Sequence, residues 1–167
     1  TEIYTRSLHD ALPICVGKQG KGAITAIYTV LAENDDNSDP IVDIARASLD
    51  GQVLLSRSLA DAAHYPAIDL NGSISRVMQS LVDQKTNYLG GRFRRLWSLY
   101  QQNEDLIKVG AYKSGTNAEL DEAIRVREKM VSFLRQDLNQ HHSFQDSIKD
   151  MSTIMNESES LLKSPMS

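Results

Sequence analysis

Apolar residues in the second half of the chain recur three and four positions apart, which is the spacing of an amphipathic helix. The first such face consists of Leu89, Phe93, Leu96, Trp97, Tyr100 and Ile107. The second consists of Leu120, Ala123, Ile124, Met130, Val131 and Leu134, and a third begins at Phe144 with Ile148, Met151 and Met155. Gly110 is a suitable stop for the first helix, and a turn is expected at residues 115–117. The pattern therefore predicts three helices joined by turns.

The first half of the chain has a different pattern, of short apolar runs separated by polar loops. Residues 23–31 are a continuous apolar and β-branched run, which is typical of a strand buried on both faces of a parallel sheet. Residues 52–56 predict a second, short buried strand. Residues 41–49 have helical spacing, and residues 58–64 predict a short helix or turn. The chain is therefore predicted to be rich in strands first and helical later.

Composition narrows the classes of protein to which the chain can belong. Of its 167 residues, 41% are hydrophobic and 24% are charged, as in soluble globular proteins. The formal net charge is −4, whereas nucleic-acid-binding proteins usually carry a basic surface. No nucleic-acid partner is therefore expected. The longest apolar stretch, residues 23–32, is too short to span a bilayer. The single cysteine, Cys15, excludes an internal disulfide framework and fits a reducing cytoplasm.

The first fourteen residues read differently from the rest. Residues 7–14 match one reading frame of a widely used DNA-sequencing adapter. We therefore predict that residues 1–14 are translated adapter, and that the natural protein continues upstream of residue 15. The alternative is a real N-terminal strand.

Residues 17–22 carry three glycines and two lysines and invite comparison with a phosphate-binding loop. Such a loop needs a lysine followed directly by Ser or Thr, whose hydroxyl reaches Mg²⁺. Here Gly22 follows Lys21. The segment is therefore predicted to be a flexible loop.

Two residues in the middle of the chain are candidates for binding a nucleotide. Pro66 biases Tyr65 towards an extended backbone, and an aromatic ring held in this way can stack on a flat base. A core tyrosine at a turn is the alternative. Arg76 is a planar cation within an apolar, small-residue stretch, where it can neutralise a phosphate or pair with a carboxylate.

Two other groups of residues, an arginine cluster and a histidine pair, are not predicted to form functional sites. Arg92, Arg94 and Arg95 are interpreted as the solvated face of a helix. The adjacent His141 and His142 would project in different directions, and no cysteine or carboxylate arrangement completes a site, so no metal site is predicted.

Several short segments together resemble one protein family. They are residues 23–31, 39–40, 49–57, 64–69 and 73–78. In order and spacing they are similar to the flagellar export ATPase and its virulence type III secretion relatives, both of which resemble the catalytic subunit of rotary F-type ATP synthases. The similarity extends from about residue 17 to about residue 136.

The resemblance implies an α/β fold, namely the C-terminal portion of a RecA-like nucleotide-binding core followed by a small helical domain. We assign residues 15–84 to the core, residues 85–150 to the helical domain and residues 151–167 to a tail without an assigned role. The family works as a ring of six, with the nucleotide at the interface between subunits.

The family's site residues carry over to four positions. Tyr65 corresponds to the tyrosine that packs against the adenine, and Arg76 to the arginine finger that reaches the γ-phosphate bound by the neighbouring subunit. Leu138 and Phe144 fall where the F-type subunit places apolar residues around the adenine. The family's phosphate loop, catalytic carboxylate and Mg²⁺-binding aspartate lie upstream of the matched segments, so this chain alone is not expected to hydrolyse ATP. Ala23 and Gln52 depart from the family pattern without touching these positions.

The resemblance also implies a function, which is ATP hydrolysis with Mg²⁺ at hexamer interfaces, powering flagellar type III protein export. The implied location is cytoplasmic, peripheral to the membrane export gate at the base of the export apparatus. The implied partners are further copies in a homo-hexamer, export-apparatus regulator and stalk proteins, and export chaperone–substrate complexes. A virulence secretion ATPase and a non-catalytic family member are the alternatives. An F-type β-like subunit is disfavoured, because residues 110–116 lack the acidic run of that subunit's rotor contact.

Overall fold

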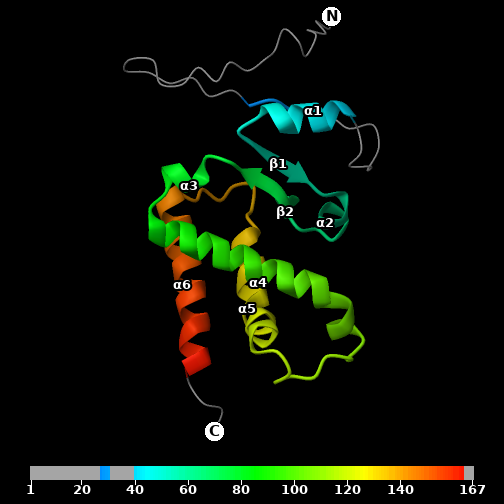
Figure 1. Cartoon of the computed structure of the whole chain (residues 1–167), viewed down its shortest axis with the longest axis vertical. Coiled ribbons are helices and arrows are strands. Elements are labelled where there is room, and N and C mark those ends of the chain that lie inside the picture. The colour runs from blue at the N-terminus through cyan, green and yellow to red at the C-terminus, as the bar shows by residue number, and fades with distance from the viewer. Residues whose placement is uncertain (1–26, 31–39, 164–167) are drawn as a thin grey trace, which may run out of the picture. The chain divides into compact units, whose positions relative to one another are not determined.

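The computed structural model describes residues 27–30 and 40–163 (Figure 1). The chain divides into two compact units, Thr1–Gln52 and Val53–Ser167. The elements in chain order are α1 (Pro40–Ser48), β1 (Gly51–Leu55), α2 (Arg57–Asp61), β2 (Ile68–Ser75), α3 (Met78–Leu81), α4 (Gln84–Lys108), α5 (Ala118–Leu134) and α6 (Phe144–Lys163). The predicted segments 1–14 and 17–22 lie outside the described residues.

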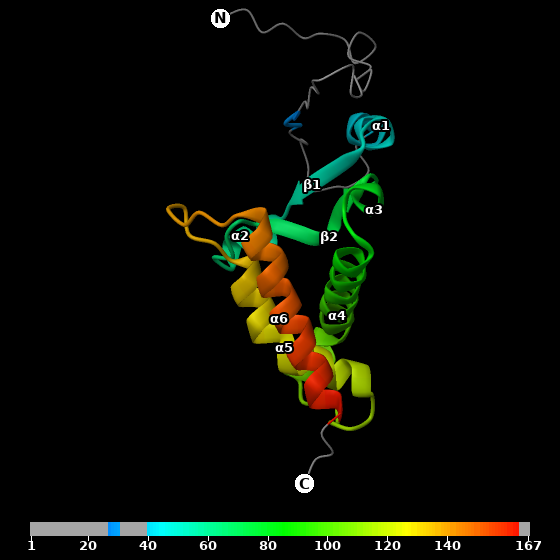
Figure 2. The same ribbon diagram turned by 90° about the vertical axis from the view of Figure 1, so that its left-hand side faces the viewer.

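Helices α4, α5 and α6 form a bundle in which each packs against the other two (Figures 1 and 2). Its buried core consists of Leu89, Phe93, Leu96, Trp97, Leu120, Ala123, Val126, Met130, Ile154 and Met155. These positions recur at helical spacing because only one stripe of each helix faces its neighbours. The three predicted helices are therefore confirmed.

Helix α6 continues across residue 150, where the sequence analysis separated the helical domain from a tail. Met155 and Ser158 are 0% and 1% exposed, so this part of α6 lies inside the bundle. The Ser158 hydroxyl donates to the Met155 carbonyl oxygen at 2.7 Å, which satisfies a polar group that burial would otherwise leave unpaired. The described part of the segment taken for a tail is thus part of the helical domain.

The ends of the bundle helices are capped by side chains and by glycine. Asp83 precedes α4, and its carboxylate accepts the Thr86 N–H at 2.6 Å, which lowers the pKa of Asp83. Asn117 precedes α5 and accepts the N–H groups of Glu119 and Leu120 at 3.0 and 3.1 Å. Gly110 has φ +71°, the left-handed conformation of a helix stop, as predicted.

The loop between α4 and α5 is tied to the first turn of α5 by Asp121. The carboxylate of Asp121 accepts the Gly115 N–H at 2.8 Å, the Tyr112 hydroxyl at 3.0 Å and the Ser114 hydroxyl at 3.2 Å. These donors, the Gly115 N–H first, lower the pKa of Asp121, and burial together with the bond to Asp121 raises the pKa of Tyr112. Gly115, with φ +88°, makes the predicted turn.

We expect Asn117→Ala to destabilise the bundle by about 1 kcal/mol, because two N–H groups at the start of α5 lose their acceptor. The measurement is urea unfolding followed by fluorescence of Trp97, the single tryptophan of the chain, which lies in the core. Asn103→Ala is the matched control. The Asn103 side chain only donates to the Leu99 carbonyl within α4, and its loss should change stability by less than about 0.5 kcal/mol. Equal losses for the two variants would contradict the capping role.

The strand predictions for the first half are wrong in two respects. Residues 27–30, the described part of predicted strand 23–31, form no strand and are exposed. Strand β1 is where it was predicted, but Val53 and Leu55 are 69% and 71% exposed instead of buried. A strand is buried on both faces only when neighbouring elements cover it, and in the described residues β1 pairs with β2 alone.

Strand β2 was missed altogether. It contains Asn71 and Gly72, a pair that is a strong turn signal in a sequence, and this hides the apolar alternation around it.

Candidate functional site

Tyr65 is held at the surface by a compact turn after α2. Ala63 has φ +52°, and the N–H groups of Ala63 and His64 donate to the carbonyl oxygens of Ala60 and Leu59, both at 2.9 Å. The Tyr65–Pro66 peptide bond is cis, and the Tyr65 hydroxyl donates to the Ala60 carbonyl oxygen at 3.3 Å. Tyr65 is 57% exposed. It is therefore not a core tyrosine, and its ring is available to a ligand.

His64, next to Tyr65, is buried inside this turn and is only 6% exposed. Burial, and then the positive charge of Arg135, lower the pKa of His64 below its usual value. The neutral form of the imidazole is therefore favoured more strongly than in an exposed histidine.

A groove of about 1040 Å³ adjoins Tyr65. Its other walls are the last two turns of α5, the connection from α5 to α6, and one side of α6. They include Lys129, Arg135, Gln136, His142 and Glu157. The Gln136 N–H donates to the Tyr65 carbonyl oxygen at 3.0 Å, so the connection is fastened directly to the tyrosine. Lys129 of α5 forms an ion pair with Glu157 of α6. The sequence analysis missed Arg135 and Gln136, although both lie just before Leu138.

Arg76 immediately follows β2, in the bend that leads to α3, and is exposed. It does not line the groove beside Tyr65. Tyr65 lies before the start of β2 and Arg76 lies directly after its end. The structure thus places the two candidate residues at opposite ends of one strand.

Leu138 and Phe144 are 104% and 65% exposed, and neither lines the groove. Leu138 lies in the connection from α5 to α6, which Gln136 fastens to Tyr65, and Phe144 is the first residue of α6. The structure therefore brings this region to the tyrosine without packing Leu138 or Phe144 against its ring.

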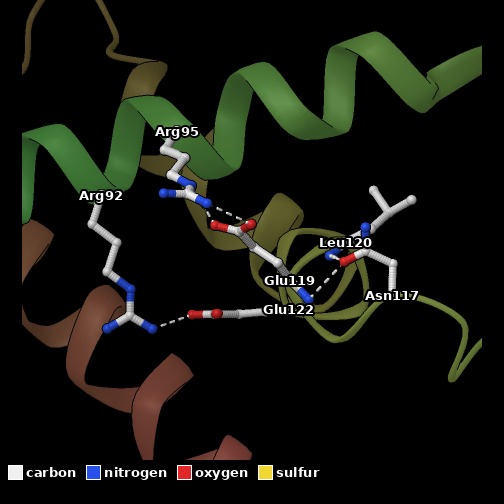
Figure 3. A network of polar contacts seen from close by, with 6 residues as sticks. All are labelled: Arg92, Arg95, Asn117, Glu119, Leu120 and Glu122. Atoms are coloured by element: carbon white, nitrogen blue, oxygen red, sulfur yellow. Dashed lines mark hydrogen bonds and ion pairs between the residues drawn. The ribbon is translucent and has the colours of Figure 1, made fainter.

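The arginine cluster of α4 faces α5 as well as solvent (Figure 3). Arg92 forms an ion pair with Glu122, and the two side chains are only 14% and 6% exposed. Arg95 engages Glu119 through two contacts, Nε to Oε1 at 2.5 Å and Nη2 to Oε2 at 2.9 Å. The interpretation of this cluster as a solvated face is wrong for Arg92, because the neighbouring helix supplies a buried carboxylate that no pattern within α4 reveals.

Within residues 27–30 and 40–163, no three His, Cys, Asp or Glu side chains are arranged to hold a metal ion. None of the helices described is both long and apolar enough to cross a membrane.

Two family models match the chain, one on each side of residue 80. The nucleotide-binding domain of the ATP synthase alpha/beta family matches residues 3–75, and the C-terminal domain of the type III secretion ATPase EscN matches residues 82–153. The first match begins inside the segment interpreted as adapter, and that interpretation stays a prediction.

Known proteins agree with these models. The flagellum-specific ATP synthase of Pseudomonas aeruginosa is 46% identical over 160 residues, which are 93% of this chain and 36% of that protein. This chain belongs to the flagellar and type III secretion ATPase family. The predicted RecA-like α/β core with a helical domain after it is thereby confirmed.

Solved structures of this ATPase family have the same fold. The assembled ATPase EscN of enteropathogenic E. coli superposes with a TM-score of 0.77 at 38% identity, covering 80% of this chain and 32% of that one. EscN in complex with its central stalk EscO superposes equally well, at 35% identity over 88% of this chain and 35% of that one. The chain spans about a third of the length of the curated relatives that it matches.

Proposed function

We propose that this chain is part of a flagellum-specific ATPase that hydrolyses ATP at the interfaces of a hexamer and thereby powers flagellar protein export. The observation that carries the proposal is the placement of Tyr65 and Arg76 at the two ends of β2. The similarity to flagellum-specific ATP synthases supports the same function.

The separation of these residues supports two different roles. Tyr65 lines the groove, whereas Arg76 lies beyond the other end of β2 and outside that groove, so we assign the two residues to two different nucleotides. Tyr65 therefore packs against the adenine of one nucleotide. Arg76 reaches the γ-phosphate of a nucleotide that is bound by a neighbouring subunit, and stabilises the charge of the transferring phosphoryl group.

The remaining parts of the nucleotide site follow from this arrangement. Leu138 and Phe144, both exposed beside the connection that holds Tyr65, complete the apolar surroundings of the adenine when the nucleotide binds. Mg²⁺ accompanies the ATP phosphates and is bound by the two thirds of the family's length that this chain does not span.

The proposed assembly is a homo-hexamer in the cytoplasm, peripheral at the base of the export apparatus. The structure of EscN with its central stalk supports a stalk protein as a partner. Regulator proteins and export chaperone–substrate complexes are the other proposed partners. A virulence secretion ATPase is the alternative within the same family, which the likeness to EscN leaves open.

The proposal is tested with a chimera in which residues 15–167 replace the matching segment of the Pseudomonas aeruginosa protein. We expect the chimera to hydrolyse ATP with Mg²⁺ and to restore swimming to a strain that lacks its own copy. Hydrolysis without restored swimming would favour the virulence alternative. A ring that assembles but does not hydrolyse ATP would overturn the proposal in favour of a non-catalytic family member.

In the chimera, we expect Tyr65→Ala to weaken ATP binding about tenfold while kcat changes less, because stacking on a base is worth about 1–3 kcal/mol. Tyr65→Phe keeps the ring and should bind ATP nearly as well as the unchanged chimera. Tyr88→Ala, an exposed tyrosine on α4, is the matched control. The measurement is titration with a fluorescent ATP analogue, and a normal affinity for Tyr65→Ala would refute the adenine role.

A further inference from the structure

Strand β2 is linked to the helical bundle by a hydrogen bond between two side chains. The Asn71 amide nitrogen donates to the Gln101 side-chain oxygen of α4 at 2.6 Å, across thirty positions of sequence. Beside it, Leu70 packs against the bundle core. Strand β2 is thus attached to the bundle at two adjacent residues, Leu70 and Asn71.

The attachment lies at a locally irregular part of β2. The Asn71 N–H donates to the Asp69 carboxylate at 2.9 Å, and the Ser73 hydroxyl donates to the Asp69 carbonyl oxygen at 2.6 Å. The same hydroxyl, and not a backbone carbonyl, accepts the Leu54 N–H of β1 at 3.0 Å. Side chains therefore supply part of the pairing between the strands here, and β2 depends on contacts beyond its strand partner for its position.

Gln101, in contrast, lies on a helix that is firmly packed in the bundle. It lies in α4, whose residues Leu96 and Trp97 are 1% and 8% exposed in the bundle core. The ion pair between Arg92 and Glu122 further ties α4 to α5. A shift of α4 relative to the sheet therefore also displaces Asn71. Asn71 lies in β2, five residues before Arg76, which lies in the bend that follows the strand.

We propose that Asn71 and Gln101 are positioning residues through which the helical bundle holds the C-terminal end of β2, and with it Arg76, in the orientation needed at the neighbouring subunit's phosphate. The inference rests on the proposed function of Arg76. Neither residue lines the groove beside Tyr65, so their removal lowers kcat and leaves the affinity for ATP unchanged. The hydrogen bond is exposed, and the expected effect is accordingly modest.

The first test does not depend on hydrolysis. Amide hydrogen exchange is measured on the full chain, for residues 74–77 at the end of β2. We expect Gln101→Ala to speed exchange there by about three- to tenfold, as the loss of one hydrogen bond implies. Gln102→Ala is the matched control, since the Gln102 side chain bonds to Ser98 within α4. Unchanged exchange in Gln101→Ala would overturn the proposal.

The second test uses the ATP-hydrolysing chimera. We expect Gln101→Ala and Asn71→Ala each to lower kcat by about three- to tenfold with an unchanged KM for ATP. The exchanged pair, Asn71→Gln with Gln101→Asn, keeps the combined length of the two amides and should restore kcat. Adding Gln101→Ala to Arg76→Ala should cost nothing further, because both changes act through the same guanidinium.

The outcomes separate this inference from the function on which it rests. If the chimera with unchanged sequence does not hydrolyse ATP, the proposed function fails, and hydrogen exchange alone decides the positioning role. If it hydrolyses ATP and Gln101→Ala has a normal kcat, or a raised KM, the positioning role is refuted and the proposed function stands.

Discussion

Replacing Arg76 by alanine in the ATP-hydrolysing chimera lowers kcat by about 10³-fold or more and leaves ATP binding nearly unchanged. Arg76 is exposed in the bend after β2, and it does not line the groove beside Tyr65 of its own chain. Its loss therefore removes charge stabilisation at a neighbouring subunit's phosphate, which matters in the transition state more than in the bound state. Steady-state hydrolysis and binding of an ATP analogue are the two measurements.

Two further variants and a mixing experiment test whether Arg76 acts as an arginine finger. Arg76→Lys keeps the positive charge but loses the planar fork, and should recover only part of the lost rate. Arg94→Ala removes an exposed arginine on α4 and should leave kcat unchanged. A mixture of Arg76→Ala subunits with subunits that lack the phosphate loop should regain activity at mixed interfaces, since each supplies what the other lacks. Normal turnover by Arg76→Ala would refute the finger.

Replacing Arg92 by methionine destabilises the bundle by about 3–5 kcal/mol, because the buried carboxylate of Glu122 loses its ion-pair partner. Methionine keeps much of the aliphatic stem of arginine, so most of the loss comes from the charge. Urea unfolding followed by Trp97 fluorescence measures the free energy of unfolding.

Figure 3 shows the pair that serves as the control, Arg95 with Glu119. These side chains are 72% and 39% exposed, and water screens their attraction. Arg95→Met should therefore cost only about 0.2–1 kcal/mol. The double variant Arg92→Met with Glu122→Leu should regain most of the stability lost in Arg92→Met, since no charge then remains buried. Equal losses for Arg92→Met and Arg95→Met would contradict the role of burial.

The sequence predicted α4, α5 and α6 well because each helix is long and its apolar stripe is a local property of the chain. It predicted β2 poorly because a strand that contains Asn71 and Gly72 is stabilised by contacts with Leu54 and Gln101, which are distant in sequence. The tail boundary at residue 150 failed for the same reason. The apolar spacing already placed Met155 on the face of the third predicted helix, but only the packing of α4 and α5 against α6 shows that this residue is buried.

The candidate site could likewise be predicted from the sequence only in part. Tyr65 and Arg76 could be named from the sequence, because the resemblance rests on short segments that surround them. Three features could not be predicted, because each joins residues that come together only in the folded chain. They are the groove, the bond from Gln136 to Tyr65, and the bond from Asn71 to Gln101.

By itself, the amino-acid sequence determined the helical second half, its stop at Gly110, its turn at Gly115 and the family, and it suggested the two residues that we propose contact a nucleotide. These depend on local periodicity, on backbone conformations that glycine favours, and on short motifs. Only the tertiary structure decided that Tyr65 is exposed, that Arg92 is buried with Glu122, and that β2 is attached to the bundle at a point between Tyr65 and Arg76. The physical reason is that burial and pairing belong to neighbours in space, and a single sequence does not state which distant residues those neighbours are.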